Sequence, residues 1–198
     1  MLLPAPTPTC VLFGLGDTLL QEHTFDLVTG IDTLIQDRPH SAALALEFQT
    51  ELTRSHETDG EILLAEWLLW RLPELEQSVQ QLETLIWPKI VELAPTEHVE
   101  TALGYLAARA IPMGVVSNAP FSGRILAGEL SRHELLRHFR FVLSSADIGQ
   151  RKPGTAILHQ RRPRNAPAPE LNPGRRSITT GTLVTASRKE GIAGRARA

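Results

Sequence analysis

Short apolar runs that end in tight turns alternate with helical segments along this chain, and this alternation constrains the fold most. One run, Cys10–Phe13, is followed by Gly14 and Gly16, which suits a buried strand that ends in a turn. Two further runs of this kind lie within 111–120 and 140–149. Strands that alternate with helices predict a parallel sheet, with ligand sites at the carboxyl ends of its strands.

Between the first and second runs the sequence has the periodicity of helices instead. Apolar residues recur at three- and four-residue steps in four segments, 25–36, 41–57, 61–72 and 78–93. Three helix breakers are expected to separate these segments: Pro39, Gly60 and Pro73. The tryptophans of this region fall on the apolar faces, which predicts packing inside a helical bundle: Trp67, Trp70 and Trp87.

These patterns together predict an α/β fold, with a Rossmann-like parallel-sheet core and a helical cap inserted after the first strand. We expect the core to comprise 9–20 and 95–198, and the cap to comprise 21–94. An insertion at that point can fold over the site as a lid. The pattern decays in 154–198, which is expected to be degenerate and partly disordered, with one further strand and turn possible in 177–187.

The net charge of −2 hides an uneven distribution. Residues 1–150 carry 9 Lys and Arg against 20 Asp and Glu, whereas residues 151–198 carry 11 against 2. A basic segment can bind nucleic acid. No aromatic residue follows Phe141, however, so bases would have nothing to stack on. We therefore expect a solvated tail and no nucleic-acid partner.

Three observations predict a soluble, cytoplasmic protein without a membrane partner. Cys10 is the one cysteine, so no intramolecular disulfide can form. Residues 1–10 have no basic side chain of the kind that begins a signal peptide. No apolar run approaches the ~18 residues that a membrane helix needs.

Four short stretches at the expected strand ends occur in an informative order. They are LFGLGDTLL (12–20), VVSNAP (115–120), SADIGQRKP (145–153) and ITTGTL (178–183). This order resembles the haloacid dehalogenase-like (HAD) superfamily, particularly its phosphatase-like members with a helical cap. The resemblance covers 9–153 well and 178–198 only faintly, and the Ser-Asn turn followed by Arg-Lys-Pro is its most specific part.

The resemblance implies a division of labour at these strand ends. An Asp after the first strand is the nucleophile, and an Asp two residues later is the general acid/base. A Ser or Thr binds the transferred group, and a Lys neutralises its charge. In this chain the nucleophile position is Gly14 and the acid/base position is Gly16, while Ser117, Asn118 and Lys152 match the phosphate-binding positions.

The remaining matches complete the comparison with the superfamily. Asp17 and Thr18 match the positions after the acid/base residue. The family's metal position falls on Thr182, and a second acid would fall near Ser187. The resemblance implies Mg²⁺, but its acidic ligands are missing, so we expect no cofactor. The amides of the 14–18 turn are expected to contribute to anion binding.

We therefore predict a HAD-like protein that is impaired or inactive as a phosphatase and retains binding of inorganic phosphate or a small phosphorylated ligand. Two alternatives stay open. An active phosphohydrolase would need another nucleophile, and Asp17 lies three residues past the family position. A truncated or decaying gene product would have no selected activity, an interpretation that the proline- and arginine-rich tail favours. Ser117 and Asn118 can also simply satisfy backbone groups in a turn, and the sequence indicates no protein partner.

Overall fold

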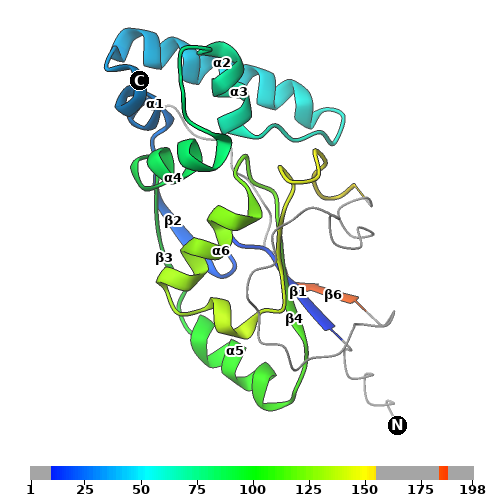
Figure 1. The fold of residues 1–198 in the computed structure, drawn as a ribbon. Helices are drawn as coiled ribbons and strands as arrows, with labels where there is room; N and C mark the ends of the chain where they lie inside the picture. Colours follow the sequence, from blue (N-terminus) through cyan, green and yellow to red (C-terminus); the bar gives the residue numbers. More distant parts are fainter. Residues whose placement is uncertain (1–9, 155–182, 187–198) are drawn as a thin grey trace.

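The computed structural model of this chain describes residues 10–154 and 183–186. Its elements in chain order are β1 (Cys10–Phe13), β2 (Leu20–Phe25), α1 (Leu27–Ile35), α2 (Arg38–His56), α3 (Leu64–Arg71), α4 (Val79–Ile90), β3 (Val91–Pro95), α5 (Val99–Ala108), β4 (Met113–Ser117), α6 (Gly123–Arg132), the 3₁₀ turn η1 (Leu136–His138), β5 (Val142–Ser144) and β6 (Leu183–Ala186). The mixed α/β fold with a Rossmann-like parallel sheet is confirmed (Figure 1).

The sheet has the strand order β5-β4-β1-β6, and all its pairs are parallel. Phe13 of β1 pairs with Val115 of β4 on one side and with Ala186 of β6 on the other. Every residue of β1 and β4 is buried, as expected for central strands of a parallel sheet. Because the strands are parallel, their carboxyl ends form one edge, where ligand sites of such sheets lie.

The helices α1 to α4 are inserted between β2 and β3, which pair antiparallel and connect this helical insertion to the sheet (Figure 1). Neither strand was predicted, since 21–94 was expected to form a helical cap, with 78–93 helical throughout. In β2, Leu20 alone is fully buried, so the alternation that signals a strand is absent. The chain after α4 becomes extended because Val91 pairs with Phe25 across the two strands.

Side-chain caps explain where the helices of the insertion begin. Asp26 accepts a hydrogen bond from the Thr29 amide at the start of α1, and Ser78 forms a capping box with Gln81 at the start of α4. Pro39 was expected between two helices. It lies instead in the first turn of α2, where a missing N–H removes no helical hydrogen bond.

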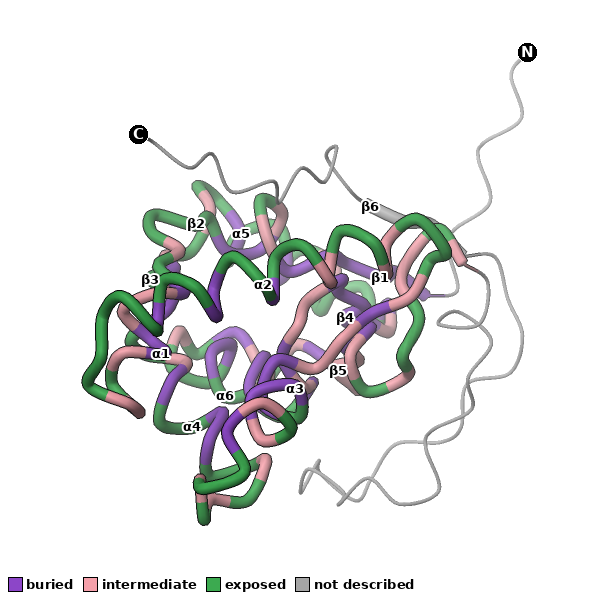
Figure 2. Tube along the Cα trace, turned by 90° about the horizontal axis from the view of Figure 1, so that it is seen from above, coloured by how far each residue is buried: buried purple, intermediate pink, exposed green. Residues whose placement is uncertain are grey.

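Two hydrophobic clusters form the main interior of the described residues. One lies between the sheet and the helices α5 and α6, and the other lies among the helices of the insertion. Phe121 and Ile125, at the start of α6, belong to the second cluster. The Phe121 ring meets Trp87 of α4 edge-on, with centroids 4.8 Å apart. The insertion therefore packs on the sheet through α6, and Figure 2 shows the buried residues of α3, α4 and α6 near one another.

The tryptophans do not all lie where the sequence predicted. Trp67 is buried against Phe48, and its indole donates to Glu51. Trp70 is 69 % exposed, which contradicts its predicted place in the bundle. The guanidinium of Arg71 lies 4.4 Å from its ring centroid, so a cation–π contact holds the exposed ring.

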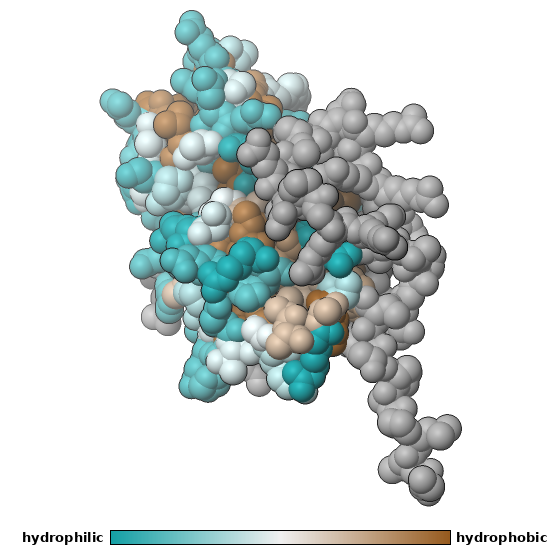
Figure 3. Space-filling view, turned by 60° about the horizontal axis from the view of Figure 1, so that its bottom comes forward, coloured by the Kyte–Doolittle hydropathy of each residue, from teal (hydrophilic) through white to brown (hydrophobic). Residues whose placement is uncertain are grey.

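The surface drawn in Figure 3 is mostly hydrophilic, and the hydrophobic areas on this face are small. Among the described helices, none combines the length and the apolar character that a membrane crossing requires. The expectations for the tail between 155 and 182 lie outside the described residues. Within 177–187, where a strand was thought possible, β6 occupies Leu183–Ala186.

Candidate functional site at the carboxyl edge of the sheet

The turn after β1 has glycine at the two positions that the resemblance assigns to catalytic carboxylates, Gly14 and Gly16. Gly14 is buried and Gly16 is partly exposed. Among the described glycines, Gly149 has a positive φ, whereas Gly14 and Gly16 do not. A Cβ added at Gly16 would meet no atom of the described residues within 4 Å beyond its chain neighbours. At Gly16 the edge therefore has room for a side chain among the described residues, and the backbone there does not require glycine.

Asp17 and Thr18 follow in the same turn, which backbone hydrogen bonds hold. Asp17 is exposed with φ 53°, and its amide donates to the Leu20 carbonyl at 2.8 Å. That amide is thus already used, contrary to the expectation that the turn's amides are available for an anion. Burial and, secondly, the charge of Asp17 raise the pKa of Glu22 in β2. The Thr18 carbonyl accepts from the Thr96 hydroxyl at 2.9 Å, which ties the turn to the end of β3.

The edge at β4 carries the predicted phosphate-binding side chains. Ser117, the last residue of β4, is buried and pairs with Ser144 of β5. Asn118 is buried, and its amide oxygen accepts from the Lys152 backbone amide at 2.8 Å. Its amide nitrogen donates to the Lys152 carbonyl at 3.1 Å. Asn118 therefore fixes the backbone of Lys152 from both sides.

The Lys152 amine lies beside β4, close to the end of β1. Its Nζ donates to the Val116 carbonyl at 2.9 Å. Phe13 of β1 pairs with Val115 of β4. Because the two strands are parallel, the residue after Phe13, Gly14, lies level with Val116. The structure thus brings Gly14, Ser117, Asn118 and Lys152 to one edge. The roles assigned to them remain predictions.

Asp147 is a residue of this edge that the sequence analysis did not single out. Its carboxylate accepts from the Gly123 amide at 2.9 Å and from the Ser144 amide at 3.3 Å. It therefore caps α6 and holds the turn that leads to Lys152. Burial raises the pKa of Asp147, while the two amide hydrogen bonds oppose that rise. The sequence gave no signal of this cap, because Asp147 lies 24 residues after Gly123, where the helix that it caps begins.

Three buried glutamates join the insertion to the sheet domain, and the sequence analysis missed them too. They are Glu61, Glu83 and Glu129. Glu83 of α4 accepts from both the amide and the hydroxyl of Ser122, each at 2.6 Å. Burial opposes ionisation of Glu129, but hydrogen bonds from Arg132 and Trp87 outweigh it, so the pKa is lowered. A glutamate in a helical segment normally indicates a solvated face. The helical periodicity of the sequence therefore gave no sign that these three glutamates are buried.

The predicted metal position lies outside the residues that the structure describes. Thr182 and Ser187 are outside the described residues. The assignment needs a strand that ends before Thr182, whereas the strand found here begins at Leu183 and has its carboxyl end at Ala186.

The described part of this edge does not fit a Mg²⁺ site. Mg²⁺ prefers carboxylate oxygens, and the two positions after β1 that should supply them are Gly14 and Gly16. No group of three or more His, Cys, Asp or Glu that could hold a metal ion occurs within residues 10–154.

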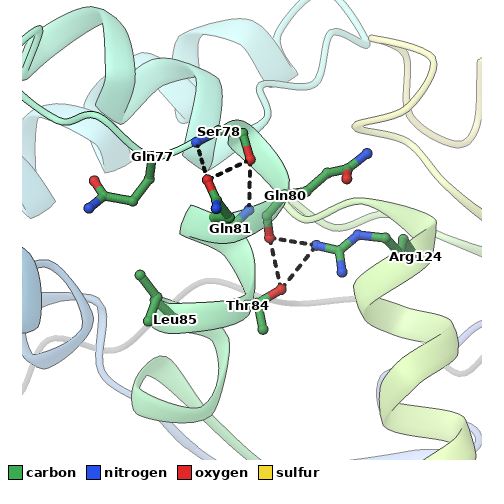
Figure 4. A pocket seen from close by; sticks show the side chains of 7 residues that line it. All are labelled: Gln77, Ser78, Gln80, Gln81, Thr84, Leu85 and Arg124. Carbon is green, nitrogen blue, oxygen red and sulfur yellow. Dashed lines mark hydrogen bonds between the residues drawn. The ribbon is translucent and has the colours of Figure 1, made fainter.

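A separate hollow of about 640 Å³ lies away from this edge, at the start of α4 (Figure 4). Polar side chains of α4 and the segment before it surround most of it, and Arg124 of α6 closes one side. The Arg124 guanidinium donates to the Gln80 carbonyl at 2.8 Å and to the Thr84 hydroxyl at 3.3 Å. None of the predicted site residues lines this hollow.

Comparison with known protein families shows which family this chain belongs to. A family model described as haloacid dehalogenase-like hydrolase matches residues 68–166. The chain belongs to this family. The matched part of this HAD-like chain contains Ser117, Asn118 and Lys152 but not the 14–18 turn.

Among solved structures, this HAD-like protein is similar to a HAD-superfamily hydrolase from Ehrlichia chaffeensis. The two share 18% sequence identity with a TM-score of 0.41, over 78% of this chain and 71% of that one. A search of curated proteins finds no match.

Proposed function

We propose that this HAD-like protein binds inorganic phosphate or a small phosphorylated ligand at the carboxyl edge of its sheet and does not hydrolyse it. The proposal rests on one observation: the same edge of the sheet keeps its predicted phosphate-binding side chains but has glycine where catalytic carboxylates are expected. Lys152 is held in place beside β4 by Asn118 and Val116, whereas the two catalytic positions are Gly14 and Gly16.

The loss of turnover follows from the chemistry of glycine. Glycine has no carboxylate, so Gly14 cannot form the aspartyl intermediate of the family. A general acid/base typically contributes 10²–10⁴-fold to the rate, and Gly16 supplies none. These two losses support a protein without phosphatase turnover.

The capacity to bind follows from the side chains that remain. The ammonium of Lys152 and the hydroxyl of Ser117 are donors suited to a phosphate oxygen, and a hydrogen bond from a charged donor is stronger than a neutral one. We propose in addition that the helical insertion acts as a cap over this edge. We also propose that the protein acts in the cytoplasm, since its one cysteine, Cys10, cannot form an intramolecular disulfide.

The test has a binding arm and a turnover arm. Phosphate should raise the melting temperature through the stabilisation RT ln(1 + [L]/Kd), which is about 2.7 kcal/mol at 100 times Kd. Lys152→Ala should abolish the rise. Lys89→Ala, which removes an exposed lysine of α4, should keep it, and sodium chloride at equal ionic strength should produce none. An equal rise in both lysine variants would refute the site.

The turnover arm uses phosphorylated metabolites with Mg²⁺. We expect no phosphate release above a buffer blank. Mg²⁺-dependent release that survives re-purification would refute the absence of turnover and favour an unrecognised nucleophile.

A further inference from the structure

The helical insertion and the loop that carries Lys152 are joined by main-chain pairing. The Arg151 amide donates to the Asp59 carbonyl at 2.9 Å, and the Glu61 amide donates to the Gly149 carbonyl at 3.1 Å. Between these two bonds, Gly60 and Gln150 form an antiparallel bridge. The segment 59–61, between α2 and α3, thus acts as a short strand alongside 149–151, directly before Lys152.

The side chain of Glu61 strengthens this connection. It is fully buried, and one carboxylate oxygen accepts from the Ser145 hydroxyl at 2.6 Å and from the Arg151 guanidinium at 3.1 Å. The other oxygen lies 3.3 Å from the His56 ring nitrogen, which also contacts Arg151. One carboxylate therefore contacts both ends of the loop 145–151.

The loop itself is a compact turn built on Ser145. The Ser145 carbonyl accepts from the amides of Ile148 and Gly149 at 3.1 and 2.8 Å. Its hydroxyl, which donates to Glu61, accepts from the Ala119 amide at 2.9 Å. A shift of Ser145 or Arg151 would therefore move the turn as a whole, together with the lysine that follows it.

We propose that Glu61 is a positioning residue, through which the helical insertion sets the place of Lys152 and hence the affinity for a phosphate group. This inference rests on the proposed phosphate binding. Asn118 supports the Lys152 backbone from the sheet domain, and Glu61 supports the preceding residues from the insertion. Loss of the carboxylate would leave the half-buried Arg151 guanidinium without its buried partner, so it would move toward solvent.

The test measures phosphate affinity and amide hydrogen exchange in Glu61→Ala and Glu61→Gln. Loss of a hydrogen bond to a charged group corresponds to about tenfold or more in an equilibrium constant. In Glu61→Ala we expect about tenfold faster exchange in 145–152, after correction for global stability, and a phosphate Kd about tenfold higher. Glu61→Gln retains a carbonyl acceptor and should recover part of both effects.

Glu83→Gln is the matched control. Glu83 is the other buried carboxylate of the insertion, and its partners, Ser122 and Arg124, lie on or directly before α6. This variant should lower the melting temperature while 145–152 keeps its corrected exchange and phosphate keeps its Kd. If Glu83→Gln changes the loop as much as Glu61→Ala does, positioning by Glu61 is refuted.

The outcomes separate this inference from the proposed function. A wild-type protein that does not bind phosphate refutes the proposed function, and the exchange data still decide whether Glu61 holds the loop. Unchanged exchange and unchanged Kd in a folded Glu61→Ala refute the inference. If Glu61→Ala does not fold, Ser145→Ala removes one contact of the same carboxylate, and unchanged exchange in that variant and in Glu61→Gln refutes the inference equally.

Discussion

The two halves of the carboxyl edge are held in different ways. After β1, the turn 14–18 is shaped by main-chain hydrogen bonds and by the Thr96 hydroxyl on a backbone carbonyl. After β4 and β5, side chains fix the backbone, as the buried Asn118 does for Lys152 and Asp147 does for α6. The difference teaches that the first half keeps its shape without catalytic carboxylates, whereas the second half depends on its side chains.

Removal of the Asn118 side chain should produce the largest effect. Asn118→Ala deletes two hydrogen bonds to the Lys152 backbone and leaves both of those groups without their partner. The expected loss of stability is about 3 kcal/mol, together with loss of the phosphate-dependent rise in melting temperature. Urea unfolding measures the first and thermal shift the second. A stability loss under about 0.5 kcal/mol would show that the side chains do not hold this half.

A methyl group at Gly123 should have the second largest effect. A Cβ there would lie 2.7 Å from the Asp147 carboxylate and 3.0 Å from the Val142 carbonyl. Gly123→Ala must therefore displace the cap of α6, at a cost of about 2 kcal/mol. Urea unfolding is again the measurement, and a neutral result would mean that the second half is less tightly packed than the contacts indicate.

The same change in the first half should have a small effect of opposite sign. A Cβ at Gly16 meets nothing within 4 Å in the described residues, and its φ is not positive. Gly16→Ala should raise stability by about 0.4–1 kcal/mol, because alanine restricts the unfolded chain. A marked destabilisation would show that the turn after β1 needs glycine for its shape.

The smallest expected effect concerns the pH dependence from Asp147. Burial raises the pKa of Asp147 in the folded protein, so its stabilising contribution is complete below the unfolded pKa of about 3.9 and is lost as pH rises through the folded pKa. Asp147→Asn, which keeps an acceptor for Gly123, should remove this loss. Relative to the wild type, the variant should gain stability as pH rises above about 3.9, by roughly a few tenths of a kcal/mol, because solvent screens this partly exposed carboxylate.

Unfolding measured at several pH values tests this point. A wild-type advantage that grows with rising pH would mean that the amides of Gly123 and Ser144 stabilise the ionised carboxylate more than burial opposes it.

The sequence allowed much of the fold to be predicted, because strands and helices differ in the spacing of apolar residues. The buried strands at Cys10–Phe13 and Met113–Ser117 and the helices of the insertion carried that signal. The strand Leu20–Phe25 did not, since its partner and not its own pattern makes it a strand. The candidate site was predictable where residue types have a fixed order along the chain, as at Ser117, Asn118 and Lys152.

The amino-acid sequence by itself determined the α/β class, the position of the helical insertion and the glycines at the two positions that the resemblance assigns to catalysis. Spacing and residue type are local properties, so they can be read along the chain. Only the tertiary structure decided that Glu61 contacts Ser145 and Arg151, and that Asn118 holds the Lys152 backbone. These pairs are far apart in sequence, and they meet because parallel strands end at one edge and the insertion folds back onto it.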